Sequence, residues 1–309
     1  MRTGQGVLRP LIVGANGLVG RALLAEYTRA GQAPFGTTRR PGPIAGDILY
    51  LDLADDQMRL TLPAGVGVVF LAAAMANYTA CEVNPLAYRV NVPNTVRLAR
   101  QVWEQGARFI FISSNTVFGG DRPFCREDDT RSPSIAYSRH KAEAEERLDT
   151  LAREMHAVER LTIVRLTKVL TTSVPPLPEW FARLEAGDRI RPFADLSFAP
   201  ISLARTVGAL RQIGNAGLSG VFHLSGAANV SYVDFARCLV ATMGLAADLV
   251  VPTTAQAAGV KLGWSPRYSG IGMARTTRLL GIEPEALESV VAQLVSERRD
   301  SGRAVRRGP

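Results

Sequence analysis

The sequence predicts an α/β protein with a doubly wound parallel sheet and a smaller C-terminal lobe. Short apolar runs alternate with segments of helical periodicity through the first half of the 309-residue chain, and this alternation is typical of parallel sheets built from right-handed crossovers. The runs 68–71 and 109–112 are apolar at successive positions, as in a sheet that helices cover on both faces. A glycine-rich turn joins the first expected strand to the first expected helix.

The expected elements follow from apolar runs and helical periodicity. In the first half, strands are expected at 10–13, 48–51, 66–73, 108–113 and 161–169, with the end of a second strand within 35–40, and helices at 19–29, 87–104 and 135–153. Three prolines, at positions 175, 176 and 178, exclude a helix interior over 171–178. Beyond them we expect helices near 179–186 and 203–213, a strand at 220–224, a helix that Ser231 caps and that ends at Met243, and a last helix near 284–295.

Composition excludes several classes of protein. The chain is 47% apolar and 21% charged, with 36 Lys and Arg against 28 Asp and Glu, and part of the +8 excess lies in the arginine-rich end, so we expect no nucleic-acid partner. Three cysteines far apart and three histidines without metal-ligand spacing predict neither disulfides nor a metal site. The first ten residues lack the apolar core of a signal peptide, and we therefore expect a cytoplasmic protein with no membrane contact.

The turn Gly14-Ala15-Asn16-Gly17-Leu18-Val19-Gly20 has the spacing of a dinucleotide-binding turn of the Rossmann type. In such a turn the first glycine permits a tight bend, the second permits close approach of a pyrophosphate, and the third permits close helix packing. The N-terminus of the following helix offers unpaired N–H groups to the anion. Cofactor contacts are therefore expected from Gly14, Asn16, Gly17, Leu18, Val19 and Gly20. A glycine-rich turn that binds nothing is the alternative.

The end of the second strand indicates which dinucleotide is bound. Residues 35–40 contain no acidic side chain that would accept a hydrogen bond from a ribose 2′-hydroxyl. Arg39 and Arg40, which follow Thr38, instead suit a 2′-phosphate and the adenine face. The sequence therefore predicts NADP(H) in preference to NAD(H), with a solvated basic loop as the alternative. Asp52 and Leu53 are expected at the adenine edge, unless Asp52 is a turn residue.

Tyr137 and Lys141 are expected to carry the chemistry. Being four residues apart on a predicted helix, they share a face. A phenol has a pKa of about 10, and we expect the nearby ammonium and the positive charge of a bound nicotinamide to lower the pKa of Tyr137 toward the working range. Ser114, at the end of a predicted strand, is expected to hydrogen-bond the same substrate oxygen. Asn91 either holds a water that relays protons toward Lys141 or is a helix-surface amide.

With these motifs the chain resembles the extended short-chain dehydrogenase/reductases, most closely the dTDP-4-dehydrorhamnose reductase-like group. The resemblance covers 11–294. It is carried by the three glycines of the turn and by Leu71-Ala72-Ala73, 81–85, 87–92, 113–120, Tyr137 with Lys141, 220–226 and 280–282.

The resemblance implies roles for individual residues. Ser114, Tyr137 and Lys141 take the family's catalytic positions, and Asn91 takes its fourth, supporting position. Leu71, Ala72 and Ala73 join the cofactor contacts, as do Tyr137 and Lys141. Asn115, which argues against a 4,6-dehydratase, and Arg267 are expected to contact the substrate, with a surface role as the alternative for Arg267.

The implied activity is the reduction of a keto group on a nucleotide-activated deoxysugar with NADPH or NADH. Three alternatives stay open: a 4-epimerase that retains its cofactor, a non-catalytic NADP-binding regulatory subunit, and a reductase of carbonyl substrates that carry no nucleotide. The expected dinucleotide-binding domain is 1–170, with segments from 201–224. The substrate-binding lobe is 171–200 and 225–296, and a flexible basic tail is 297–309. A homodimer could form through paired helices, and the expected helices for this are 87–104, 135–153 and 284–295.

Overall fold

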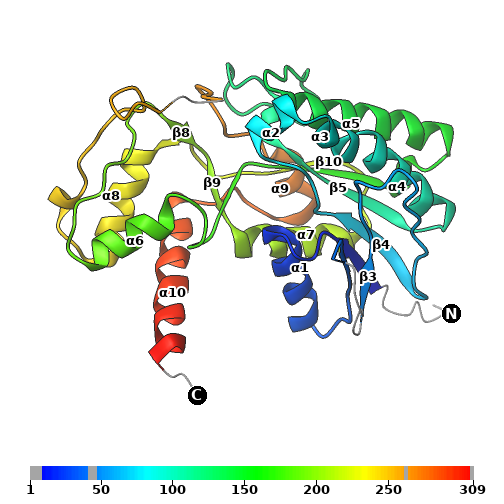
Figure 1. Ribbon diagram of the computed structural model, residues 1–309, viewed down its shortest axis with the longest axis horizontal. Helices are drawn as coiled ribbons and strands as arrows, with labels where there is room; N and C mark the ends of the chain where they lie inside the picture. The colour runs from blue at the N-terminus through cyan, green and yellow to red at the C-terminus, as the bar shows by residue number, and fades with distance from the viewer. Residues whose placement is uncertain (1–8, 41–46, 261–263, 307–309) are drawn as a thin grey trace. The chain divides into compact units, whose positions relative to one another are not determined.

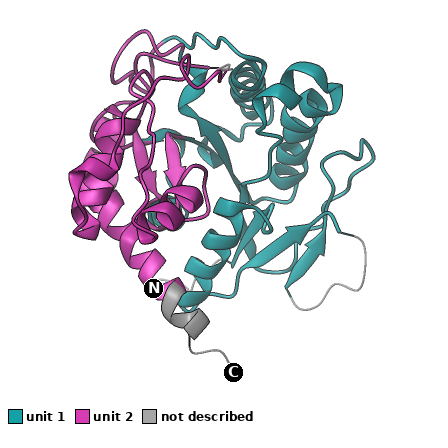
Figure 2. Cartoon of the chain, turned by 60° about the vertical axis from the view of Figure 1, so that its left-hand side comes forward, with its two compact units in different colours: residues 1–118, 130–165, 207–223 teal, residues 119–129, 166–206, 224–309 magenta. Residues whose placement is uncertain are grey.

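The computed structural model of the chain describes residues 9–40, 47–260 and 264–306. The chain divides into two compact units (Figure 2). Unit 1 comprises residues 1–118, 130–165 and 207–223, and unit 2 comprises residues 119–129, 166–206 and 224–309. No helix in the described ranges has both the length and the apolar composition needed to cross a bilayer.

The central sheet confirms the predicted fold class. Among the described residues it has seven strands in the order β10-β6-β5-β4-β1-β2-β3. Their bounds are β1 (Arg9–Val13), β2 (Phe35–Thr38), β3 (Ile48–Tyr50), β4 (Val66–Leu71), β5 (Arg108–Ser114), β6 (Leu161–Leu166) and β10 (Gly220–Leu224). Strands β1 to β5 pair in parallel, for example Ile12 with Phe70 and Phe70 with Ile110. The carboxyl ends of these strands therefore meet at one edge, where ligands bind in such folds.

Helices cover both faces of the sheet, as the two-sided apolar strands predict. The helices associated with the sheet are α1 (Leu18–Arg29), α2 (Tyr78–Val83), α3 (Pro85–Asn91), α4 (Pro93–Glu104), α5 (Ala136–Glu154) and α7 (Leu203–Ala216). In Figure 1, α3, α4 and α5 lie on one side of the sheet, and α1 lies on the other. Alternate strand residues serve the two layers: Leu71 and Phe111 pack with Leu148 of α5, whereas the ring of Phe70 lies 5.8 Å from that of Tyr27 of α1.

The single helix expected over 87–104 is wrong, because the chain forms two helices there. α3 ends at Asn91 and α4 begins at Pro93, with Val92 between them at φ −120° and ψ −81°. Proline has no N–H to donate inside a helix, but it is well tolerated in the first turn. The break therefore falls where Pro93 can open a new helix.

Unit 2 is built on short strand pairs and a separate core. Its strands are β7 (Lys168–Leu170) with β9 (Pro200–Ser202), which pair in parallel, and β8 (Ser197–Phe198) with β11 (Val230–Ser231), which pair in antiparallel fashion. Its helices are α6 (Leu177–Glu185), α8 (Tyr232–Met243), α9 (Ala274–Leu280) and α10 (Leu287–Arg306). Trp180, Phe198 and Phe235 pack in its core. Ser231 caps α8 as predicted, since its Oγ accepts from the N–H of Asp234 at 3.0 Å.

Two stretches expected in the first domain belong to unit 2. The segment 119–129 joins unit 2 because the carbonyl of Gly120 accepts from the N–H of Tyr268 at 2.9 Å. Residues 166–170 do so because β7 pairs with β9. The first-domain boundary at residue 170 therefore falls a few residues late.

The flexible tail expected from residue 297 is also wrong at its start. Helix α10 continues to Arg306, and two of its residues bind other segments of unit 2. The carboxylate of Glu297 accepts hydrogen bonds from Thr171 and Thr172, and Arg298 pairs with Glu185 at 2.6 Å. Residues 307–309 of that expected tail lie outside the described residues.

Candidate active site

The glycine turn between β1 and α1 is shaped by close backbone approaches. Gly14 has φ +91°, and a Cβ there would lie 2.8 Å from Ala73, which follows β4. A Cβ on Gly20 would lie 2.2 Å from the carbonyl oxygen of Gly14. Both positions therefore require glycine. Gly17 is the N-cap of α1 and supplies no side-chain cap to the first amides of the helix.

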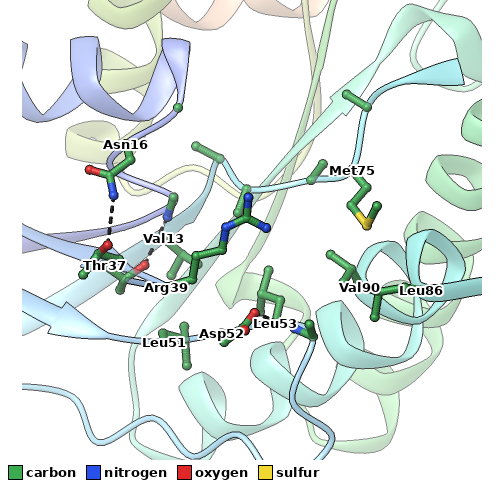
Figure 3. A pocket seen from close by; sticks show the side chains of 18 of the residues that line it. Val13, Asn16, Thr37, Arg39, Leu51, Asp52, Leu53, Met75, Leu86 and Val90 are labelled. Atoms are coloured by element: carbon green, nitrogen blue, oxygen red, sulfur yellow. Dashed lines mark hydrogen bonds between the residues drawn. The ribbon is translucent and has the colours of Figure 1, made fainter. Parts of the chain in front are cut away.

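A pocket of about 550 Å³ opens at the carboxyl ends of these strands (Figure 3). It is lined from the glycine turn, from the end of β2, from the segment after β3 and from the loop between β4 and α2. Of the residues predicted to bind the cofactor, the lining contains Gly14, Asn16, Gly17, Thr38, Arg39, Arg40, Asp52, Leu53, Ala72 and Ala73. Among the described residues, Leu18, Val19, Gly20, Leu71, Tyr137 and Lys141 do not line it.

The end of β2 presents a basic side chain to this pocket. Figure 3 shows Arg39 extending from β2 into the space, and the side chain is exposed. Thr38 organises the strand end, because its Oγ1 accepts from Asn16 Nδ2 at 2.9 Å and from the N–H of Arg40 at 3.1 Å. Asp52 lines the pocket. It is also a turn residue, which was the alternative to a role at the adenine edge, because its Oδ1 accepts from the N–H of Ala54 at 2.9 Å.

The three residues expected to be catalytic meet where α5 packs on the end of β5. The side chain of Ser114 hydrogen-bonds Tyr137. One helical turn further on, Lys141 Nζ donates to the carbonyl of Ile112 at 2.8 Å and lies 4.4 Å from the centre of the Phe111 ring. Tyr137 and Ser114 are therefore in contact, and Lys141 is held against the adjoining β5 backbone.

In the chain by itself the pKa of Tyr137 is raised, and the lowering expected once a positively charged nicotinamide is bound stays a prediction. Removal of water around the phenol raises its pKa above the ordinary value, and Tyr78 and Cys81 add to the rise, whereas the hydrogen bond with Ser114 lowers it. Burial also lowers the pKa of Lys141 to about 8, although Glu145 and Cys81 oppose the change. Tyr137 therefore keeps its proton at neutral pH, because removal of water disfavours the charged phenolate.

Asn91 is a buried residue, so its interpretation as a helix-surface amide is wrong. Its Oδ1 accepts from the N–H of Met75 at 2.9 Å, and its Nδ2 donates to the Met75 carbonyl at 2.8 Å. Asn91 thus fixes the loop after β4, where Met75 lines the pocket. A water held by Asn91 stays a prediction.

The two residues expected to bind substrate fall in different units. Asn115 is buried directly after Ser114, at the start of the short 3₁₀ helix Asn115–Val117 in unit 1. Arg267 belongs to unit 2, where its exposed guanidinium lies 5.2 Å from the ring centre of Tyr268. Their roles toward a substrate stay predictions. No cluster of three or more His, Cys, Asp or Glu in the described ranges is arranged to hold a metal ion.

Sequence reasoning missed residues on both sides of the site. Met75, Asn77, Ala80, Leu86 and Val90 also line the pocket, and the signal for them was their place after a parallel strand. Tyr78 was missed as well, and its ring lies 5.5 Å from that of Tyr137. Glu145, fully buried four residues beyond Lys141, was detectable from the same helical spacing that pairs Tyr137 with Lys141.

The fold and the site together define a Rossmann-type α/β protein with serine, tyrosine and lysine at the carboxyl end of one parallel strand. A family model described as the RmlD substrate binding domain matches residues 8–299. The chain belongs to this family, and hence to the dTDP-4-dehydrorhamnose reductase-like group within the short-chain dehydrogenases/reductases.

Curated relatives cover most of the chain. It is 27% identical over 289 residues to a probable low-salt glycan biosynthesis reductase, Agl14, of Haloferax volcanii, covering 92% of this chain and 96% of the relative. It is 28% identical over 263 residues to dTDP-4-dehydrorhamnose reductase of Mycobacterium tuberculosis, covering 80% and 79% of the two chains.

Solved structures with this fold span nearly the whole chain. A dTDP-4-dehydrorhamnose reductase from Bacillus anthracis in complex with NADP has a TM-score of 0.76 at 21% identity, covering 96% of this chain and 100% of that one. MoeE5 in complex with UDP-glucose and NAD has a TM-score of 0.74 at 21% identity, covering 95% and 99%. These likenesses confirm the Rossmann-type architecture.

Proposed function

We propose that the protein is an NADPH-dependent reductase of a keto group on a nucleotide-activated sugar. The observation that carries the proposal is the contact between Tyr137 and Ser114 at the carboxyl end of β5. The neighbouring strand β4 leads into the loop that lines the glycine-turn pocket. The proposed proton donor, Tyr137, and the hydroxyl of Ser114 therefore lie at the end of β5, which is the strand next to β4, and the loop after β4 lines the dinucleotide pocket.

The described residues suit a dinucleotide on three grounds. The turn at Gly14 brings its backbone and Ala73 together without side chains between them. The uncapped N-terminus of α1 borders the pocket at Gly17, and such helix ends attract phosphate. Arg39 extends into the same pocket (Figure 3), which favours a 2′-phosphate and hence NADPH over NADH.

The chemistry assigned to the chain is proton donation and orientation. A bound reduced nicotinamide would supply hydride to the carbonyl carbon. Tyr137 gives its proton to the carbonyl oxygen, and Ser114 hydrogen-bonds that oxygen, so that the C=O group becomes CH–OH. The raised pKa of Tyr137 keeps the donor protonated before reaction, and the Lys141 ammonium one helical turn away stabilises the negative charge left on Tyr137.

The nucleotide-sugar class rests on similarity to the relatives. The Mycobacterium relative is named as a dTDP-4-dehydrorhamnose reductase, and MoeE5 was solved with UDP-glucose. We assign Asn115 and Arg267 to substrate binding on the same basis.

Purified protein should be mixed with NADPH and a panel of dTDP- and UDP-linked 4-keto sugars. We expect NADPH oxidation, read by absorbance, to match the keto sugar consumed. Sugar conversion without net oxidation would instead establish the epimerase. NADPH binding without turnover of any nucleotide sugar or free carbonyl compound would favour the regulatory subunit and overturn the proposal.

A further inference from the structure

Three residues of α5, spaced four apart, reach three consecutive residues of β5. Tyr137 contacts Ser114, and Lys141 donates to the carbonyl of Ile112. Glu145 accepts from Ser113 Oγ at 2.5 Å. Positions i, i+4 and i+8 lie on one face of a helix. The first two members of this row have a role in the proposed reaction, and the third has none so far.

Glu145 is a fully buried carboxylate that binds two arginines. Arg165 of β6, which is 2% exposed, contacts it through Nε at 3.0 Å and through Nη2 at 2.7 Å. Arg131, which lies before α5, also donates to Oε2 of Glu145 at 3.0 Å. Such pairing offsets the cost of removing a charge from water. The site is therefore built to hold an ionised carboxylate with fixed geometry.

Further groups hold Arg165 in place. Its Nη1 lies 3.2 Å from Nε2 of His223 on β10, and its guanidinium lies 5.0 Å from the ring centre of Phe118. The hydrogen bonds and the charge of Arg165 lower the pKa of Glu145 below its ordinary value despite burial, with help from Ser113 and Arg131. The carboxylate is thus ionised at neutral pH.

We propose that Glu145 is a positioning residue for the proposed reductase reaction: its carboxylate, fixed by Ser113 and Arg165, holds the Lys141 ammonium in its charged form beside Tyr137. Lys141 itself is 3% exposed, and an isolated ammonium is disfavoured at such a place. The groups that act on it are Glu145 on α5, Cys81 on α2 and the Phe111 ring on β5. Tyr137 lies one helical turn before it on α5.

Support for this assignment comes from the balance of charges at Lys141. Burial lowers the pKa of Lys141 to about 8, and Glu145 is the larger of the two influences that raise it. Without the carboxylate, more of the lysine would be neutral at the working pH and unable to stabilise the charge left on Tyr137. The inference rests on the proposed function for its meaning, but the charge of Lys141 can be measured without turnover.

The chain is well suited to that measurement because it contains three lysines, Lys141, Lys168 and Lys261. Protein labelled with ¹³C and ¹⁵N lysine gives a side-chain signal for each, and Lys168→Arg and Lys261→Arg assign them. The full-length protein is titrated by NMR as wild type and as Glu145→Gln. We expect Glu145→Gln to shift the Lys141 pKa downward and to leave that of Lys168 unchanged. An unchanged or higher Lys141 pKa would overturn the proposal.

Arg131→Gln is the matched variant, because it removes a cation from the same carboxylate but keeps Arg165. We expect it to shift the Lys141 pKa upward, opposite to Glu145→Gln. Without the positive charge of Arg131, the negative charge of Glu145 acts more strongly on the Lys141 ammonium. A general loosening of the fold would not produce opposite signs. If Glu145→Gln does not fold, Arg131→Gln decides: an upward shift supports the proposal, and no shift or a downward shift contradicts it.

Kinetics then separate this inference from the proposed function. With wild-type turnover of a keto sugar in hand, Glu145→Gln should move the alkaline limb of the kcat profile to lower pH and leave the substrate KM within about twofold. An unmoved limb would contradict the role of Glu145 while leaving the reductase assignment standing. Absence of wild-type turnover would contradict the reductase assignment, and the NMR shift would remain as the test of Glu145.

Discussion

The ring of Tyr78 lies against that of Tyr137, with centroids 5.5 Å apart and planes inclined by 32°. Tyr78 is the first residue of α2, and Asn77 before it lines the pocket. The contact therefore links the dinucleotide pocket to the proposed proton donor. It also helps to raise the pKa of Tyr137.

Replacing Tyr78 tests whether this contact holds the donor in place. Tyr78→Phe keeps the ring and should retain kcat within about twofold. Tyr78→Ala removes a ring pair that contributes about 0.5–1.5 kcal/mol, and should lower kcat by up to about tenfold. Steady-state kinetics on both variants measures the difference. Equal losses in the two variants would show that the hydroxyl of Tyr78, and not its ring, matters.

The glycine turn offers a matched pair of substitutions. A Cβ on Gly20 would lie 2.2 Å from the Gly14 carbonyl, whereas a Cβ on Gly17 would lie 3.4 Å from it. Gly20→Ala should therefore destabilise the fold by about 1–3 kcal/mol or more, and Gly17→Ala by about 1 kcal/mol at most. Urea unfolding measures both values.

Cofactor binding separates the two glycines further. Gly17 lines the pocket, so a methyl group added there in Gly17→Ala should weaken NADPH binding by about 1–3 kcal/mol, roughly fivefold to 150-fold. Calorimetric titration on the folded variant checks this loss. Unaltered affinity would mean that no pyrophosphate approaches Gly17.

Much of the fold was predictable because it depends on local patterns. Apolar runs predicted the parallel strands, and spacing placed Tyr137 and Lys141 on one face of α5. The break at Val92 was not predicted, because periodicity continues across Pro93. The helical continuation past Glu297 was missed because its contacts with Thr171 are 126 positions away in the chain.

The site itself was predicted in part for a similar reason. Residue type and spacing identified Ser114, Tyr137 and the glycine turn. The rise in the pKa of Tyr137 was not predicted, because it depends on burial of the phenol and on the neighbouring Tyr78 and Cys81, which arrive from a different helix. Asn91 was read from its chain position, but its burial against Met75 depends on how α3 packs.

Arg39 should set the choice between the two dinucleotides. A charge-assisted hydrogen bond contributes about 1.5–3 kcal/mol, so Arg39→Gln should weaken NADPH binding by roughly tenfold to a hundredfold and leave NADH binding nearly unchanged. Arg29→Gln is the control, because it removes the same charge from an exposed position at the end of α1 where it pairs with Glu26. Equal losses for NADPH and NADH would contradict recognition of a 2′-phosphate by Arg39.

Lys141 predicts how the reaction depends on pH. Because its pKa is about 8, the rate of keto reduction should fall as the pH rises through about 8 and the ammonium loses its proton. The arginine in Lys141→Arg stays charged over this range, so the reaction rate of this variant, measured against pH, should not fall near pH 8.

The free energy of unfolding should depend on pH in the opposite direction to the reaction rate. The pKa of Lys141 is lower in the folded chain, so the unfolded chain binds more protons between about 8 and about 10.4. The contribution of Lys141 to the free energy of unfolding therefore rises with pH across that window. Urea unfolding of wild type and Lys141→Met at several pH values checks the sign, and a contribution that falls with pH would contradict the lowered pKa.

The most direct test of the central claim follows a labelled hydride. Wild type and Tyr137→Phe are incubated with deuterated NADPH and a nucleotide-linked keto sugar, and the product is analysed by mass spectrometry and NMR. We expect one deuterium at the new carbinol carbon with wild type and a rate lower by about 10²–10⁴ with Tyr137→Phe, the range for loss of a general acid. Product without deuterium, or an undiminished rate in Tyr137→Phe, would contradict reduction by this site.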